Sequence, residues 1–296
     1  MKIGFFGDGP WAERALQRLA QDQRYTIVFV AVRASRPDQK LIALAKKNGV
    51  PVLCPASINS AESLAEIGKF AADLHLSMSY DQIFRENILG LPPRGTLNCH
   101  AGALPFYRGR NPLTWAIING ETETGVTTFF LQHEIDTGKI IFQEKEPILD
   151  DDNVGSLYER LKVKGSEVVL KTVQAIAEGT APSIPQIAPI ALRSAPKIFK
   201  ETCELHWTET AAQVRNKVRG LSPYPGAWST LNEKIFKILS VSLSDSNKSG
   251  SPGDLDTDGK TYVRVCTTQG WITIDELQPE GKRKMKIREF LAGNKL

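Results

Sequence analysis

Short apolar segments alternate with helical segments through the first third of the chain, and this alternation limits the fold more than any other feature. An apolar run over Lys2–Phe6 predicts a buried strand, apolar spacing predicts a helix over Trp11–Ala20, and Tyr25–Val32 predicts a second strand. Because a strand–helix–strand unit crosses over right-handedly and leaves its strands parallel, this order predicts an α/β fold.

The alternation continues towards residue 80. It predicts two more helices and two more strands, over Gln39–Asn48, Ala61–Phe70, Val50–Leu53 and Leu74–Met78. The expected fold class is therefore a Rossmann-like, mostly parallel sheet. A nicotinamide-binding site is disfavoured, because Ala12 fills the third glycine position after Gly7-x-Gly9. The second strand also runs into Arg33 instead of an acidic residue.

One stretch, LNCHAGALPFYRGRNP over Leu97–Pro112, combines polar groups with tight turns after an apolar run. Asn98 and His100 are two residues apart, so on a strand they point to one face. An amide and an imidazole aimed at one point suit a reaction that builds negative charge on a carbonyl oxygen. Asp136, in the turn Ile135–Gly138, supplies a carboxylate that can orient and charge the imidazole. We expect all three side chains at the carboxyl ends of strands, where open α/β sheets bind ligands.

The pattern changes in the last 120 residues. A long amphipathic helix is expected over Ser156–Ala177, and an extended linker follows from four prolines, Pro182, Pro185, Pro189 and Pro196. Beyond it, a helix is expected over Ala211–Leu221, an exposed loop over Ser244–Gly259, and short strands over Cys203–Trp207, Ile235–Val241, Tyr262–Thr267 and Trp271–Leu277. These strands predict a second, smaller, β-rich domain of the OB-like type. The expected domains are residues 1–180, a linker over 181–203, and a β-barrel-like accessory domain over 204–296.

The composition is that of an ordinary globular protein, with 41% hydrophobic and 24% charged residues among 296. A net charge of +4 allows an anionic partner such as tRNA, a folate tail or a nucleotide sugar, but requires none. Four cysteines without paired spacing, Cys54, Cys99, Cys203 and Cys266, argue against a disulfide framework and a zinc site. We expect a soluble, cytoplasmic protein with no metal, no membrane partner and no DNA partner.

Several motifs resemble those of the formyltransferase family that uses 10-formyltetrahydrofolate. In the first part they are LNCHAGALPFYRG, NGETETGVT over Asn119–Thr127 and IDTG over Ile135–Gly138. The C-terminal part resembles the accessory domain of methionyl-tRNA formyltransferases in VRGLSPYPGAW over Val218–Trp228 and ELQPEGKRKMKIREFLAG over Glu276–Gly293. The resemblance spans nearly the whole chain.

This resemblance implies transfer of a formyl group from 10-formyltetrahydrofolate to a primary amine, without a metal. Asn98 is implied to donate a hydrogen bond to the oxyanion, His100 to stabilise the oxyanion or shuttle the amine's proton, and Asp136 to hold His100. The implied folate-binding residues are Gly102, Ala103, Leu104, Pro105 and Tyr80, and the implied substrate-binding residues are Arg108 and Arg110.

The resemblance leaves the acceptor open. Methionyl-tRNA formyltransferases carry a long basic loop in the first half, whereas Arg33–Leu41 is short here, as in formyltransferases that act on nucleotide-linked amino sugars. The family's usual serine in the folate loop is Gly102 here. The C-terminal motifs favour methionyl-tRNA, and the basic run Lys282-Arg283-Lys284 offers phosphate contacts or a solvated face. An amino sugar acceptor is the alternative. A non-catalytic folate- or tRNA-binding relative is a third reading.

Overall fold

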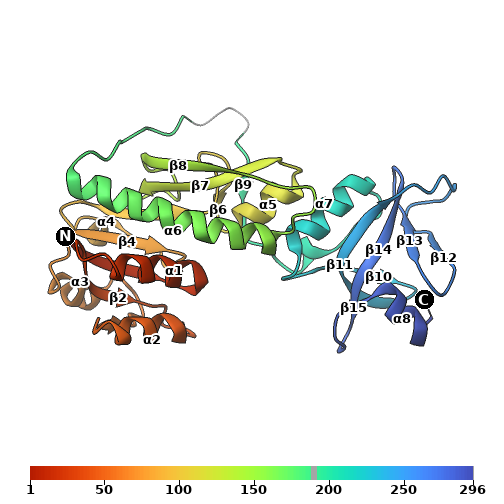
Figure 1. Cartoon of the computed structure of the whole chain (residues 1–296), viewed down its shortest axis with the longest axis horizontal. Coiled ribbons are helices and arrows are strands. Elements are labelled where there is room, and N and C mark those ends of the chain that lie inside the picture. The colour runs from red at the N-terminus through yellow and green to blue at the C-terminus, as the bar shows by residue number, and fades with distance from the viewer. Residues whose placement is uncertain (188–191, 296) are drawn as a thin grey trace. The chain divides into compact units, whose positions relative to one another are not determined.

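The computed structural model of this protein describes residues 1–187 and 192–295, which form two compact units (Figure 1). The first unit comprises Met1–Gly109, Thr124–Glu146 and Glu159–Ser194. The second comprises Arg110–Glu123, Pro147–Tyr158 and Ala195–Leu296. Within the described ranges, no helix is both long and apolar enough to cross a membrane.

A seven-stranded sheet in the order β3-β2-β1-β4-β5-β7-β8 forms the centre of the first unit. Its strands are β1 (Lys2–Gly7), β2 (Thr26–Ala31), β3 (Val52–Leu53), β4 (Leu74–Met78), β5 (Thr96–His100), β7 (Glu123–Phe130) and β8 (Ile140–Pro147). The first five strands in this order pair in parallel, and β7 pairs antiparallel with β5. The prediction of a Rossmann-like, mostly parallel sheet is therefore confirmed.

Side chains cap two of the helices that belong to the described part of the first unit. The helices are α1 (Gly9–Ala20), α2 (Gln39–Lys47), α3 (Ala61–Gly68), the short α4 (Glu86–Leu89) and most of α6 (Val154–Glu178). Asp38 caps α2 and Ser60 caps α3 through side-chain oxygens.

Helix α6 packs against the sheet. The hydroxyls of Thr128 on β7 and Thr172 on α6 are 2.8 Å apart, and Figure 1 shows α6 running along one face of the sheet.

An aromatic cluster fills the core on one side of this sheet. Phe6 makes edge-to-face contacts with Phe29 and Phe84 at centroid distances of 5.3 and 5.0 Å. His75 on β4 lies in the same cluster, 5.1 Å from the ring of Phe6, and is only 1% exposed. Its Nδ1 has no hydrogen-bond partner among the described residues. Burial lowers the pKa of His75 from 6.5 to about 4, because the charged imidazolium loses its hydration there.

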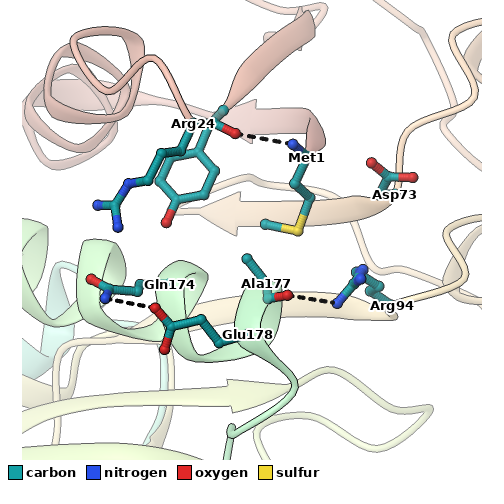
Figure 2. A pocket seen from close by; sticks show the side chains of 8 residues that line it. Met1, Arg24, Asp73, Arg94, Gln174, Ala177 and Glu178 are labelled. Atoms are coloured by element: carbon teal, nitrogen blue, oxygen red, sulfur yellow. Dashed lines mark hydrogen bonds between the residues drawn. The ribbon is translucent and has the colours of Figure 1, made fainter.

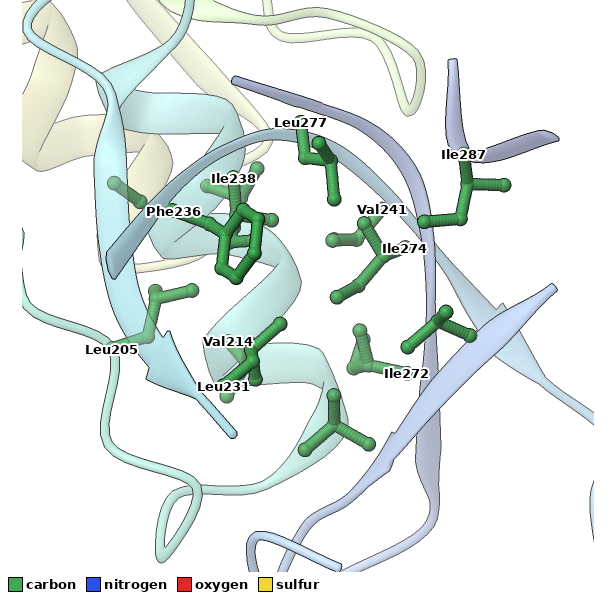
Figure 3. Close-up of a cluster of buried hydrophobic side chains, with 14 of the residues drawn as sticks. Leu205, Val214, Leu231, Phe236, Ile238, Val241, Ile272, Ile274, Leu277 and Ile287 are labelled. Atoms are coloured by element: carbon green, nitrogen blue, oxygen red, sulfur yellow. The ribbon is translucent and has the colours of Figure 1, made fainter. Parts of the chain in front are cut away.

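The second unit contains a six-stranded antiparallel sheet together with several helices. The sheet consists of β10 (Ala227–Leu231), β11 (Lys234–Ser244), β12 (Leu255–Thr257), β13 (Val263–Cys266), β14 (Trp271–Pro279) and β15 (Met285–Lys286). The helices are α5 (Pro112–Ile118), α7 (Ala211–Leu221) and α8 (Ile287–Gly293). Figure 3 shows buried side chains of β11 and β14, such as Ile238 and Ile274, meeting Val214 of α7. The predicted β-rich C-terminal domain is confirmed.

Close packing of α5 against α7 depends on one glycine. A Cβ at Gly220 would lie 2.7 Å from Cγ1 of Ile118 and 2.8 Å from the carbonyl oxygen of Thr114. A larger residue at position 220 would therefore push the two helices apart. This packing explains why helical segments from distant parts of the sequence belong to the same unit.

Several expected elements differ from the observed ones. The predicted strand over Cys203–Trp207 is wrong: a 3-10 turn covers Glu201–Cys203, and only an isolated bridge joins Glu204 to Trp228. The loop expected over Ser244–Gly259 contains the short strand β12, and β10 and α8 were not anticipated. Residues 188–191 of the expected linker lie outside the described residues.

The buried His75 predicts a specific acid sensitivity. Its pKa is about 4 in the folded chain and 6.5 as the reference value, so the unfolded chain binds the proton more tightly. Stability should therefore fall as the pH drops below about 6.5, by about 2 kcal/mol at pH 4.5 from this residue alone. Urea unfolding at pH 7 and pH 4.5 would measure this, with His75→Leu losing that part of the pH dependence. An unchanged pH dependence in the variant would contradict the prediction.

Candidate active site

Strand β5 presents Asn98 and His100 on one face. Cys99 between them is buried and contacts Trp11 of α1, which places Asn98 and His100 on the opposite side of the strand. His100 is buried, whereas Asn98 is half-buried. The side-chain amide of Asn98 makes no hydrogen bond to any described residue. It is therefore available to a ligand.

The imidazole of His100 lies between two oxygen acceptors. Its Nε2 is 2.9 Å from the carbonyl oxygen of Tyr107, and its Nδ1 is 3.5 Å from Oδ2 of Asp136. Because a carbonyl can only accept, Nε2 carries the hydrogen, and the neutral ring has its lone pair on Nδ1. The backbone N–H of Gly109 donates to the same Oδ2 at 2.9 Å. The 3.5 Å distance from Nδ1 to Oδ2 is too long for a strong hydrogen bond, so Nδ1 makes no strong bond to Asp136.

Asp136 reaches His100 by a route that the sequence analysis did not anticipate. Strand β7 runs antiparallel to β5, with His100 opposite Thr127 and Leu97 opposite Phe130. The loop after β7 therefore starts beside the amino half of β5, so Asp136 follows the carboxyl end of a strand that runs antiparallel to β5. The loop over 131–139 folds back, with Asp136 in the left-handed region at φ 54°.

A glycine makes this return possible. A Cβ at Gly138 would lie 1.6 Å from the carbonyl oxygen of Phe130, so no other residue fits without moving the backbone. The IDTG motif therefore has a structural reason for its last residue: Gly138 lets the turn pack against the end of β7, and this places the carboxylate of Asp136 beside His100.

The loop over residues 102–105 is braced by side chains of two neighbouring strands. The hydroxyl of Thr127 donates to the carbonyl of Gly102 at 2.7 Å and accepts from the N–H of Leu104 at 3.2 Å. Gln143 on β8 donates to the carbonyl of Leu104 at 2.8 Å. The predicted folate loop, which also contains Ala103 and Pro105, is thus fixed against the sheet that carries His100.

The remaining predicted site residues lie in different surroundings. The ring of Tyr80 packs against Phe6 at 5.6 Å, and burial raises the pKa of its phenol, so its side chain belongs to the aromatic cluster. Arg108 belongs to the first unit and donates to Gln186. Arg110 is exposed in the second unit, where its N–H donates to the carbonyl of Ala195.

Thiol and metal chemistry find no support among these side chains. Burial raises the pKa of the Cys99 thiol to about 12, which keeps it protonated and unreactive at neutral pH. In the parts of the chain that the structure describes, no cluster of three or more His, Cys, Asp or Glu side chains is placed to hold a metal ion.

A pocket of about 350 Å³ lies at the opposite, amino-terminal edge of the sheet (Figure 2). Its polar groups are occupied by the protein itself. The N-terminal amine donates to the carbonyl of Arg24, Arg94 donates to carbonyls at the end of α6, and Gln174 donates to Glu178. Because its donors are already paired, this pocket is a weaker candidate than the site around His100.

Comparison with known proteins identifies the family to which this chain belongs. A formyl transferase family model matches residues 1–173, and a model of the formyl transferase C-terminal domain matches residues 197–295. The chain belongs to the formyltransferase family. The methionyl-tRNA formyltransferase of Bacteroides fragilis is 38% identical over 309 residues, covering 99% of this chain and 95% of that protein. That of Citrifermentans bemidjiense is 35% identical and covers 100% and 94%. The protein is therefore a formyl-transferring enzyme.

Solved structures with the same fold include two formyltransferases. One is the N-formyltransferase of Helicobacter canadensis in complex with folinic acid and dTDP-3-aminofucose, with a TM-score of 0.69 and 21% identity over 96% of this chain and all of that one. The other is WlaRD, a sugar 3N-formyl transferase solved with dTDP and 5-N-formyl-THF, with a TM-score of 0.70 and 21% identity over 96% and 99%. At this identity they establish the fold.

The sequence analysis did not identify several residues that position the candidate site around His100. Thr127 lies in the NGETETGVT motif, but nothing local shows that its hydroxyl braces the loop over 102–105. Gln143 and Gln186 carry no motif at all. The carbonyl of Tyr107 is a backbone group, so no side-chain pattern could have pointed to it.

Replacing Gly138 by alanine should reduce formyl transfer about a hundredfold, because a misplacement of about 1 Å in a catalytic group has effects of this size. The new Cβ would displace the turn and draw Asp136 away from His100. Steady-state rates would measure the effect, and circular dichroism would show that the fold is retained. Gly68→Ala is the matched control, since a Cβ there meets nothing within 4 Å. Full activity in Gly138→Ala would show that the turn does not position Asp136.

Proposed function

We propose that this enzyme transfers a formyl group from 10-formyltetrahydrofolate to the amino group of methionyl-tRNA, in the cytoplasm. The observation that carries the proposal is the 38% identity to a methionyl-tRNA formyltransferase across both units. The second unit contains none of Asn98, His100 and Asp136. The sequence similarity to the methionyl-tRNA formyltransferase extends over this unit as well, so it supports a shared acceptor in addition to shared chemistry.

The site fits such a folate substrate. The amide of Asn98 has no partner among the described residues, and the loop over 102–105 is held firmly enough to offer backbone groups to a ligand. When bound, 10-formyltetrahydrofolate supplies the formyl carbon as the electrophile and its nitrogen as the leaving group. We assign Asn98 the role of donating a hydrogen bond to the formyl oxygen as negative charge develops on it.

His100 handles the proton in this proposal. The attacking amine forms a bond to the formyl carbon and loses a proton, which Nδ1 of His100 accepts and then returns to the leaving nitrogen. The carboxylate of Asp136, 3.5 Å from Nδ1, stabilises the imidazolium that forms. The carbonyl of Tyr107 keeps the hydrogen on Nε2, so that Nδ1 is the basic nitrogen.

A groove in the second unit supports tRNA as the acceptor. It has a volume of about 560 Å³ and is lined by the aromatic residues Phe199, Tyr224 and Trp228 and by Lys200 and Lys237. Tyr224 is 82% exposed, and Nζ of Lys200 lies 5.9 Å from the ring of Trp228. Exposed rings beside lysines suit unpaired bases and their phosphates.

A nucleotide-linked amino sugar is the second candidate acceptor. The turn between β2 and α2 over residues 32–38 is short, and two of its three charged side chains, Arg33 and Asp38, are bound by the protein, whereas Arg36 is exposed. Arg33 pairs with Asp8 at 2.7 Å, and Asp38 accepts from the N–H groups of Gly9, Lys40 and Leu41. A turn engaged in this way offers few groups to an acceptor stem, which favours a smaller acceptor.

A competition between acceptors tests the proposal. Purified enzyme with 10-formyltetrahydrofolate should release tetrahydrofolate with initiator methionyl-tRNA and not with a panel of dTDP-linked amino sugars. Asn98→Ala should lower turnover about 10²–10³-fold without unfolding the chain, because it removes one oxyanion donor. Turnover with an amino sugar alone would reject the tRNA proposal, and turnover with neither would reject both acceptors.

The groove generates a separate prediction. Tyr224→Ala should raise the KM for methionyl-tRNA about tenfold while leaving kcat nearly unchanged, because stacking of one base contributes about 1–3 kcal/mol. Lys260→Ala, at an exposed lysine outside the groove, is the matched control. An unchanged KM in Tyr224→Ala would show that the groove does not contact the acceptor.

A further inference from the structure

The proline-rich segment after α6 holds one side chain that touches both supports of the catalytic histidine. Gln186 donates from Nε2 to the carbonyl oxygens of Asp136 and Gly138, both at 2.8 Å. Its Oε1 accepts from Nη2 of Arg108 at 2.7 Å and from Nε at 3.2 Å. Carbonyls only accept and a guanidinium only donates, so these partners fix the orientation of the amide. Both its N–H groups and its oxygen are therefore used.

The two sets of bonds join parts of the site that are far apart in the sequence. The carbonyls of Asp136 and Gly138 flank the turn that places Oδ2 of Asp136 beside His100. Arg108 lies between Tyr107, whose carbonyl meets Nε2 of His100, and Gly109, whose N–H donates to Oδ2. Gln186 thus connects the carboxylate side of the imidazole to its carbonyl side.

The segment that carries Gln186 is anchored on each side of residues 188–191. Ile184 exchanges two backbone hydrogen bonds with Ile140, at 2.8 and 2.9 Å. The carbonyl of Arg193 accepts from the N–H of Tyr107 at 2.7 Å. The bonds of Ile184 hold the backbone two residues before Gln186 against β8.

We propose that Gln186 is a positioning residue for formyl transfer, clamping the Asp136 turn to the Tyr107–Gly109 stretch so that the carboxylate of Asp136 and the carbonyl of Tyr107 stay beside the two ring nitrogens of His100. The proposal rests on the proposed role of His100. Gln186 contacts no reacting atom, and its effect passes through Asp136 and Arg108. Its loss should therefore slow the chemical step more than it weakens substrate binding.

Two substitutions separate the two halves of the clamp. Gln186→Leu removes all four hydrogen bonds with little change in size. Gln186→Glu keeps an acceptor for Arg108 but turns a carboxylate oxygen towards the carbonyls of Asp136 and Gly138, which repels the turn. Both variants should lower kcat about 10–100-fold with KM values within twofold of the wild type, because the catalytic geometry is loosened. Gln174→Leu, which breaks one bond to a carboxylate on α6, is the matched control.

A double-mutant cycle with Asp136→Asn shows whether Gln186 acts through Asp136. In that background, Gln186→Leu should cause little further loss, because residues that act through one another are not additive. Amide hydrogen exchange over residues 131–139 should also become faster in Gln186→Leu, and this readout does not depend on which acceptor is used. Wild-type turnover, measured first, tests the proposed function separately. Four results would overturn the role of Gln186. The first two are a kcat of Gln186→Leu equal to that of the wild type, and an effect on KM alone. The other two are rate losses of Gln186→Leu and Asp136→Asn that add fully in the double variant, and an unchanged rate of hydrogen exchange over residues 131–139.

Discussion

The site depends on one buried imidazole held between two oxygens. His100 is 6% exposed, with the carbonyl of Tyr107 at one ring nitrogen and the carboxylate of Asp136 at the other. The carboxylate of Asp136 places a negative charge beside the ring, and the N–H of Gly109 donates to that carboxylate and holds it in place. The loops around β5 are arranged so that these two oxygens reach opposite sides of one ring.

That arrangement uses a change of direction in the sheet. β5 is the last of five neighbouring parallel strands in the sheet, and the next strand, β7, runs antiparallel to it. An antiparallel neighbour places Thr127 opposite His100, where its hydroxyl braces the loop over 102–105. Because β7 is antiparallel, the loop that follows it starts beside the amino half of β5, away from His100. The left-handed backbone of Asp136 and the absence of a side chain at Gly138 allow this loop to fold back towards His100.

Local patterns and distant contacts explain what the sequence could and could not predict. The predicted bounds Leu74–Met78 and Ala211–Leu221 coincide with β4 and α7, because apolar periodicity is a local property. The direction of β7 depends on its partner strand, which periodicity does not specify. Cys203–Trp207 has strand-like composition, but only Glu204 finds a bridge partner. The bond from Gln186 to Asp136 spans 50 residues, and no motif marks it. Asn98 and His100 could be predicted to share a face from the sequence, because side chains two residues apart on a strand point to the same side.

The chemistry around His100 cannot by itself select the acceptor. In the proposed mechanism, Asn98, His100 and Asp136 act only on the formyl group and on the attacking amine. Methionyl-tRNA and an amino sugar both provide such an amine. Discrimination must therefore come from binding energy at groups remote from the reacting atoms. In the first unit, the turn over 32–38 is short and leaves one exposed cation, Arg36, since Arg33 and Asp38 are bound by the protein. In the second unit, Tyr224 and the lysines of the groove are exposed and can contact a ligand. If the acceptor is tRNA, the second unit must therefore supply most of the specificity, because the short turn in the first unit offers only one free cation.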